Sequence, residues 1–207
     1  MQRRHLPTAL AVISASALAW SLPAPAAPVS VGQPAPPFSL KDTAGRLVQL
    51  ADFAGKTVVL EWTNPGCPFV RKHYASGNLP AQQKAATAAG VVWLTVNSTS
   101  PRHGDHMAPA DLGDWMTAQG AAPTATLLDP DGLVGRSYGA KTTPQLVVIQ
   151  PQGRLAYVGA VDSIASARPE DIARATQHVP GVLAQLAAGQ PVRPAVTAPY
   201  GCSVKYD

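Results

Sequence analysis

Short apolar runs alternate with amphipathic stretches along most of the chain. Runs of this kind, bounded by glycine, proline or polar turns, are typical of strands that are buried on both faces of a sheet. A smaller hairpin is expected near the start, where 46–50 alternates polar and apolar residues. The pattern predicts central strands at 57–62, 91–97, 124–128, 145–149 and 155–161, the last two joined as a hairpin.

Helical stretches separate the earlier strands. Glycines and prolines predict their limits, with Gly77 ending one helix, Pro80 lying in the first turn of the next and Gly90 ending it. The resulting helices are predicted at 67–77, 79–89, 111–119 and 171–188, the last weakened at Pro180 and Gly181. Strands separated by helices and followed by a late hairpin predict an α/β fold with a mixed sheet.

The first 26 residues have the order of a secretory signal peptide. Arg3 and Arg4 precede a short apolar core at 9–22 and the small-residue segment 24–26. This core is too short to cross a bilayer, so we expect export, cleavage near Ala26 and no stable membrane span in the mature form. The chain is then expected to divide into a leader at 1–26, one domain at 27–190 and a Pro-rich tail at 191–207.

Charge and composition exclude several classes of function. The net charge is +4 at pH 7, and two of the positive charges belong to the leader. Lysines and arginines are scattered rather than clustered with aromatic residues, so nucleic acid is not an expected partner. The sequence contains no phosphate loop, Ser-His-Asp order or structural zinc spacing, and we expect no cofactor.

Cys67 follows the first central strand directly and stands at the start of a predicted helix. Unpaired N–H groups and the helix dipole stabilise a thiolate at such a position, and the thiolate is the nucleophile. Arg71 and Lys72, one turn later, would lower the pKa further, into the range of about 3.5 to 7.5. Pro65 and Gly66 predict an exposed turn before the cysteine. The alternative is a buried structural cysteine.

Several segments together resemble the redoxin branch of the thioredoxin superfamily, which includes peroxiredoxins and periplasmic thiol-disulfide proteins. Within this branch, the chain is similar to a bacterial peroxiredoxin-like subgroup that has a lone active-site cysteine and a C-terminal Gly-Cys-Ser-Val-Lys-Tyr motif. The resemblance implies a thioredoxin fold, with a central mixed β-sheet flanked by helices and an N-terminal β-hairpin extension. The segments that carry it are 32–40, 55–60, 67–74, 143–144, 153 and 200–206.

The chain departs from both parent patterns of this superfamily. Cys67 falls on the first cysteine of the Cys-x-x-Cys motif, but Val70 holds the second position. The peroxiredoxin pattern Pro-x-x-x-Thr-x-x-Cys is unmet, because Leu60 and Asn64 stand at its proline and threonine positions. Neither parent mechanism therefore transfers whole.

The resemblance implies roles for three further residues. Thr143 and Pro144 match the cis-proline site, where the residue before proline offers its backbone to an incoming thiol or disulfide partner. An ungapped count places Glu61 on the buried acid that assists proton transfer in thioredoxins. Burial would raise its pKa and suit it to act as a base. A structural or exposed glutamate is the alternative.

Cys202 lies in a tail that could fold back over Cys67. As a resolving thiol it would attack an oxidised Cys67 and close an intramolecular disulfide. The same pair could instead form a permanent disulfide, or Cys202 could bridge to another molecule. Gly201 and the polar tail favour mobility, and so a redox-active role.

Together these features predict a peroxiredoxin-like antioxidant oxidoreductase. Cys67 would attack a peroxide or disulfide substrate, Cys202 would resolve the product, and a thiol-reducing partner protein would restore the pair. Disulfide exchange without peroxidase activity is the first alternative. The residues expected to line the substrate pocket are Thr63, Asn64, Pro65, Gly66, Arg71, Thr143 and Pro144.

A copper-binding thioredoxin-fold protein is the second alternative. Cysteine, histidine and methionine are soft ligands that suit copper. His73 follows Cys67 on the predicted helix, and His103, His106 and Met107 share a polar loop. Histidines also collect in polar loops without metal, and we expect no metal site.

Overall fold

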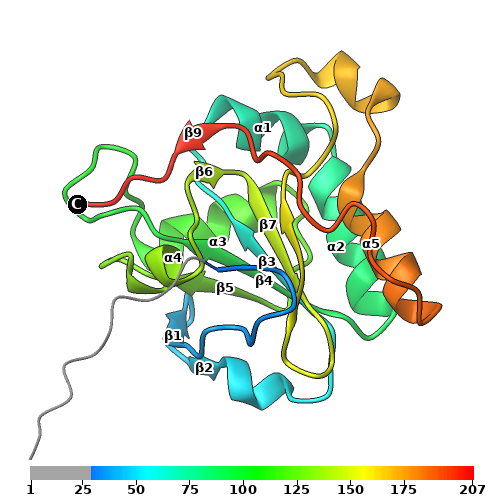
Figure 1. The fold of residues 1–207 in the computed structure, drawn as a ribbon. Helices are drawn as coiled ribbons and strands as arrows, with labels where there is room; N and C mark the ends of the chain where they lie inside the picture. The colour runs from blue at the N-terminus through cyan, green and yellow to red at the C-terminus, as the bar shows by residue number, and fades with distance from the viewer. Residues whose placement is uncertain (1–28) are drawn as a thin grey trace, which may run out of the picture.

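The computed structural model describes residues 29–207, and a seven-stranded mixed sheet forms its centre (Figure 1). The strand order is β2-β1-β5-β4-β3-β7-β8, with β3, β4 and β5 parallel and the other pairings antiparallel. The strands are β1 Ser39–Asp42, β2 Leu47–Gln49, β3 Val58–Trp62, β4 Val92–Asn97, β5 Ala125–Leu128, β7 Gln145–Ile149 and β8 Leu155–Gly159. The expected leader at 1–26 lies outside the described residues.

The helices connect the parallel strands and then follow the late hairpin. The expected early helices are confirmed, and a short helix α4 follows β5 that the sequence pattern did not predict. Within 29–207 no helix is both long and apolar enough to cross a bilayer. The bounds are η1 Leu50–Phe53, α1 Pro68–Ala75, α2 Asn78–Ala88, α3 Pro109–Ala118, α4 Leu133–Ser137, η2 Pro169–Arg174 and α5 His178–Ala187.

The prediction of one helix over 171–188 was wrong. The chain forms the 3-10 helix η2 and then α5, with extended backbone between them. This break arises because Thr176 exchanges hydrogen bonds with Ser163, pulling the backbone into a short bridge. Pro180 does not weaken the helix, since it lies in the first turn of α5, where its missing N–H is not needed.

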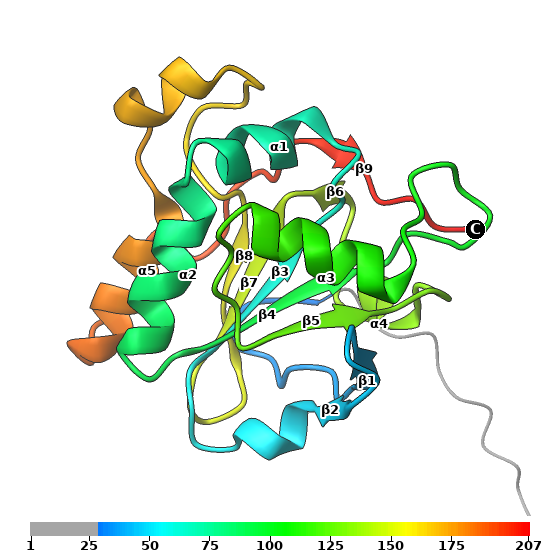
Figure 2. The ribbon, with the colours of Figure 1, turned by 180° about the vertical axis from the view of Figure 1, so that it is seen from behind.

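The central strands are buried throughout because both faces of the sheet are covered. Strand β3 shows this alternation, with Val59 and Glu61 on one face and Leu60 and Trp62 on the other. Side chains from α1, α2, α3 and α5 pack on the first face, part of which Figure 2 shows, while the N-terminal hairpin and α4 cover the second. Because β3 is buried on both faces, its end fixes the position of the start of α1.

A second, two-stranded sheet lies beside the start of α1. It pairs β6 Thr142–Thr143 with β9 Cys202–Ser203 from the C-terminal tail (Figure 1). Residues far apart in the sequence therefore meet at one edge of the molecule.

Candidate active site

Cys67 stands immediately before α1, after a tight connection from β3. Its amide donates to the carbonyl of Asn64 at 2.9 Å, and the Asn64 side chain accepts from the amide of Gly66 at 2.8 Å. Pro68 begins the helix, where a missing N–H costs nothing. The prediction of an exposed turn was wrong, because Pro65 is buried and Cys67 is only 1% exposed.

The thiol of Cys67 faces the backbone of Thr143. It donates a hydrogen bond to the Thr143 carbonyl oxygen, with 3.0 Å between sulfur and oxygen. The peptide bond from Thr143 to Pro144 is cis, as the resemblance implied, and both residues are buried. The two segments that the sequence separates by 76 positions therefore form one site.

The C-terminal tail completes this site from the other side. In the antiparallel pairing of β6 with β9, Thr143 lies opposite Cys202. The tail therefore brings Cys202 to the residue whose carbonyl receives the Cys67 thiol. Both cysteines are free thiols in this structure.

The neighbouring Cys67 influences the protonation of Cys202. Burial, followed by a hydrogen bond to Cys67 and the nearby charge of that group, raises the pKa of Cys202 to about 11. Cys202 therefore holds its proton at neutral pH. A thiol attacks as its thiolate, so Cys202 is a poor nucleophile while it keeps its proton.

The tail folds back over Cys67, as the sequence allowed, and backbone contacts hold it there. Gly201 has φ +136°, and an added Cβ would lie 2.0 Å from the Thr143 carbonyl oxygen, so only glycine fits this approach. After Cys202 the tail continues to bind the body of the protein. The amide of Val204 donates to the carbonyl of Lys141 at 3.0 Å.

Glu61 is completely buried on the helix-covered face of the sheet. Tyr74 donates to one carboxylate oxygen at 2.6 Å, and Gln83 and Trp93 donate to the other at 3.0 and 2.8 Å. Burial raises the pKa of Glu61, as expected from the sequence. The three neutral donors come from α1, α2 and β4, and they fit the alternative that Glu61 has a structural role. A role of Glu61 in proton transfer stays a prediction.

The expected pocket residues do not all face the thiol. The side chain of Arg71 turns back to donate to the carbonyl of Pro65 at 2.7 Å. Lys72 is buried 3.5 Å from Asp162, so its charge serves that carboxylate rather than the thiol. Thr63 is buried, and the amide of Asn64 binds Asp105 of the 98–108 loop at 3.0 Å, next to Gly66. The roles of these residues in substrate binding remain predictions.

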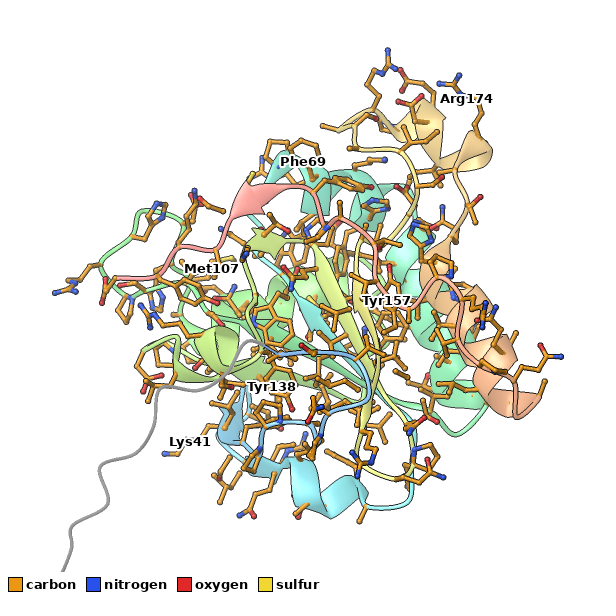
Figure 3. The ribbon with its side chains drawn as sticks, viewed as in Figure 1. Lys41, Phe69, Met107, Tyr138, Tyr157 and Arg174 are labelled. Carbon is orange, nitrogen blue, oxygen red and sulfur yellow. The ribbon has the colours of Figure 1, made fainter. Side chains whose placement is uncertain are left out.

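The histidines that could have formed a copper site are not assembled around Cys67. His73 is buried, with one ring nitrogen 2.8 Å from the Asn78 amide and the other 3.1 Å from the Tyr200 hydroxyl. His103 lies on an exposed loop and contacts Asp105. Residues 29–207 hold no group of three histidine, cysteine or acidic side chains that could bind a metal ion. His106 and Met107 lie on the same loop, in which Figure 3 labels Met107.

A hollow in the described part of the chain lies away from the thiols. This groove of about 1020 Å³ runs between α2 and α5 and is mainly apolar. Ala85, Leu183 and Leu186 are among its lining residues, whereas neither cysteine lines it. The groove therefore adjoins the helix-covered core and not the candidate site.

Sequence reasoning missed a group of polar residues packed against α1, of which Lys72, His73 and Asp162 are buried and Tyr200 is half-buried. Asp162 and Tyr200 bind each other there and contact Lys72 and His73. The sequence offered little signal for it beyond the position of Lys72 and His73 between the apolar Val70 and the aromatic Tyr74, all four of which are buried in α1.

The fold and this pair of facing thiols define an oxidoreductase of the thioredoxin superfamily. Residues 31–158 match the AhpC/TSA family, and the chain belongs to that family. This assigns it to the redoxin branch, as the sequence segments indicated.

Individual relatives agree with this placement. The thiol-disulfide oxidoreductase ResA of Bacillus subtilis (strain 168) is 28% identical over 130 residues, which are 63% of this chain and 67% of ResA. The structure is similar to a hypothetical protein of Sinorhizobium meliloti 1021, with a TM-score of 0.73, 22% identity and coverage of 86% and 96% of the two chains. It also matches the thioredoxin domain of a thiol-disulfide oxidoreductase from Bacteroides vulgatus, with a TM-score of 0.51, 20% identity and coverage of 70% and 97%.

Proposed function

We propose that the protein is a thiol-disulfide oxidoreductase that cycles between the thiols of Cys67 and Cys202 and an intramolecular disulfide. The observation that carries this proposal is the meeting of both cysteines at Thr143. The Cys67 thiol binds the Thr143 carbonyl at 3.0 Å, and Cys202 pairs with the same residue across the small sheet. The likeness to ResA supports disulfides as the substrate class.

The reaction runs in two exchanges. The Cys67 thiolate attacks one sulfur of a substrate disulfide, forms a mixed disulfide and releases the other half as a thiolate. The Cys202 thiolate then attacks the Cys67 sulfur, closes the internal disulfide and releases the second substrate thiolate. The substrate gains the two electrons that the pair loses, and a thiol-reducing partner protein returns them.

Cys202 becomes easier to ionise once the first exchange has taken place. Part of its raised pKa comes from the hydrogen bond to Cys67 and from the charge of that group. Both contributions vanish when the Cys67 sulfur is bonded to a substrate. Cys202 therefore stays protonated before the first exchange and ionises more easily after it.

The test is the intact mass and thiol count of the reduced protein after mixing with glutathione disulfide. We expect the wild type to lose two thiols and the mass of two hydrogens. Cys202→Ser should stop at a glutathione adduct on Cys67, and Cys67→Ser should remain reduced. A wild type that keeps both thiols, or a Cys67→Ser variant that reacts equally fast, would contradict the proposal.

Peroxide reduction is the second candidate function. Cys67 is 1% exposed, which suits a small oxidant better than a bulky disulfide, and the family includes peroxiredoxins. Peroxide would convert the thiolate to a sulfenic acid and release water or an alcohol, and Cys202 would then close the disulfide with loss of water. The same mass measurement with stoichiometric hydrogen peroxide separates the two: a peroxidase consumes the oxidant within seconds, whereas an exchange protein reacts only with the disulfide.

We also propose that the protein is exported and that Ala26 is near its cleavage site. The leader-like order of 1–26 supports this assignment, and an extracytoplasmic compartment is one in which disulfides persist. The proposed boundaries remain 27–190 for the redoxin domain and 191–207 for the tail with Cys202. N-terminal sequencing of the protein recovered from its native host tests the cleavage position.

A further inference from the structure

A buried charged cluster anchors the tail just before Cys202. We define this tail-anchor cluster as Lys72 and His73 of α1, Asp162 after β8 and Tyr200 of the tail. The side chains of Lys72 and Asp162 are completely buried and lie 3.5 Å apart as an ion pair. Lysine and aspartate are almost never fully buried without a partner, so a specific arrangement holds them here.

The hydroxyl of Tyr200 links this cluster to the tail. It donates to Asp162 at 2.5 Å and lies 3.1 Å from Nε2 of His73. Burial lowers the pKa of His73 to about 4, so the ring is neutral at pH 7. Asn78 donates to Nδ1 at 2.8 Å, and the neutral ring therefore carries its proton on Nε2 and donates it to the Tyr200 oxygen. The hydrogen bonds therefore run in one direction, from Asn78 to His73, from His73 to Tyr200 and from Tyr200 to Asp162.

The ring of Tyr200 is held as well as its hydroxyl. Phe69, labelled in Figure 3 on α1 beside the C-terminal strand, packs edge-on against it at 5.8 Å between centroids. The ammonium group of Lys72 lies 5.8 Å from the centre of the same ring. Two residues of extended chain span at most about 7 Å, so fixing Tyr200 limits where Cys202 can lie.

We propose that Tyr200 is a positioning residue that holds Cys202 for its attack on Cys67. This inference rests on the proposed function. The anchor acts on the second exchange and leaves the first alone, because Cys67 is positioned by β3 and α1 rather than by the tail. Loosening Tyr200 would lower the rate of disulfide closure without altering the reactivity of Cys67.

Tyr200→Phe tests this inference, because it keeps the ring and removes only the hydroxyl. Reduced protein is mixed with glutathione disulfide, quenched in acid at intervals and weighed by mass spectrometry. The Cys67–glutathione adduct and the closed disulfide differ in mass, so both exchanges are followed in one experiment. We expect closure to slow by about tenfold, with the adduct accumulating, since the hydroxyl's two hydrogen bonds are lost. Formation of the adduct, measured also in the Cys202→Ser background, should change by less than about twofold.

Tyr138→Phe is the matched control. Tyr138 is another tyrosine whose hydroxyl donates a hydrogen bond, here to the carbonyl of Pro36. It is buried in the core on the other face of the sheet, away from the tail-anchor cluster. Its loss should leave the closure rate unchanged even if thermal stability falls. Phe69→Leu is a second variant, which removes the packed ring without disturbing a hydrogen bond, and should slow closure about threefold.

The outcomes separate the two proposals. Equal closure rates in wild type, Tyr200→Phe and Phe69→Leu would overturn the positioning role while leaving the two-thiol reaction intact. Slower closure in Tyr138→Phe to the same degree would also overturn it, because a general loss of stability would then be the cause. A wild type that forms the adduct but never closes would refute the proposed function instead.

Discussion

Two buried acids flank helix α1, and their partners differ in kind. Glu61 receives three hydrogen bonds from neutral side chains, all within the helix-covered core. Asp162 faces the charged Lys72 and receives the hydroxyl of Tyr200 from the tail. Glu61 links α1, α2 and β4 to β3 within the core. Asp162 instead links α1 to the tail that carries Cys202. A buried carboxylate can therefore serve rigidity or positioning, and its partners decide which.

Removing the charge of Asp162 should have the largest effect. Asp162→Asn keeps an acceptor for Tyr200 but leaves the buried ammonium of Lys72 without a countercharge. Breaking one side of a buried ion pair costs about 3 to 5 kcal/mol. Urea unfolding at pH 7 should show this as a lower midpoint at unchanged slope. A loss below about 1 kcal/mol would mean that Lys72 is compensated by other groups.

The equivalent change at Glu61 should cost less. Glu61→Gln replaces one acceptor oxygen with a donor, which then faces the hydroxyl of Tyr74 or the groups of Gln83 and Trp93. An unsatisfied buried group costs about 1 to 3 kcal/mol, measured by the same urea titration. Closure of the Cys67–Cys202 disulfide should stay within about twofold of wild type. A tenfold slower closure in a folded variant would instead support Glu61 as the base.

The smallest expected effect is on the pH dependence of stability, to which His73 and Glu61 contribute with opposite sign. Burial lowers the pKa of His73 from 6.5 to about 4, so between these values the unfolded chain binds more protons and stability rises with pH. Burial raises the pKa of Glu61 above 4.5, so stability falls as pH rises above that value. Unfolding free energies at pH 4.5, 5.5 and 6.5 should therefore rise more steeply in Glu61→Gln than in wild type.

His73→Gln provides the reciprocal measurement. This change removes the titrating ring that faces Lys72, Asp162 and Tyr200, and the rise in stability between pH 4.5 and 6.5 should flatten. Equal slopes in wild type and both variants would show that neither group titrates in this window.

The sequence predicted the parts of the site that depend on local order. Cys67 follows a continuous apolar strand, and Pro68 with the surrounding residues indicates a helix start, so the thiol could be placed from its neighbours. Thr143 and Pro144 required the family resemblance, because a proline before a strand is ordinarily trans. The strands were predicted well for the same reason as Cys67, since burial on both faces leaves a nearly continuous apolar pattern.

The tail and its anchor could not be predicted in this way. Asp162 and Tyr200 are separated by 38 positions, and His73 and Tyr200 by 127, so no periodicity connects them. The glycine at position 201 suggested mobility, yet it is needed for close contact with Thr143. A glycine permits both, and only the neighbouring backbone distinguishes them.

The pairing of β9 with β6 also bears on how partners gain access to Cys67. A free strand edge can take up an extended peptide from another protein, but here the chain's own Cys202–Ser203 segment already occupies that edge. A tethered segment acts at an effective concentration that reaches the millimolar range for short linkers. A peptide that bound this edge would have to compete with the tail, and its apparent affinity for the intact molecule would understate its affinity for the edge itself.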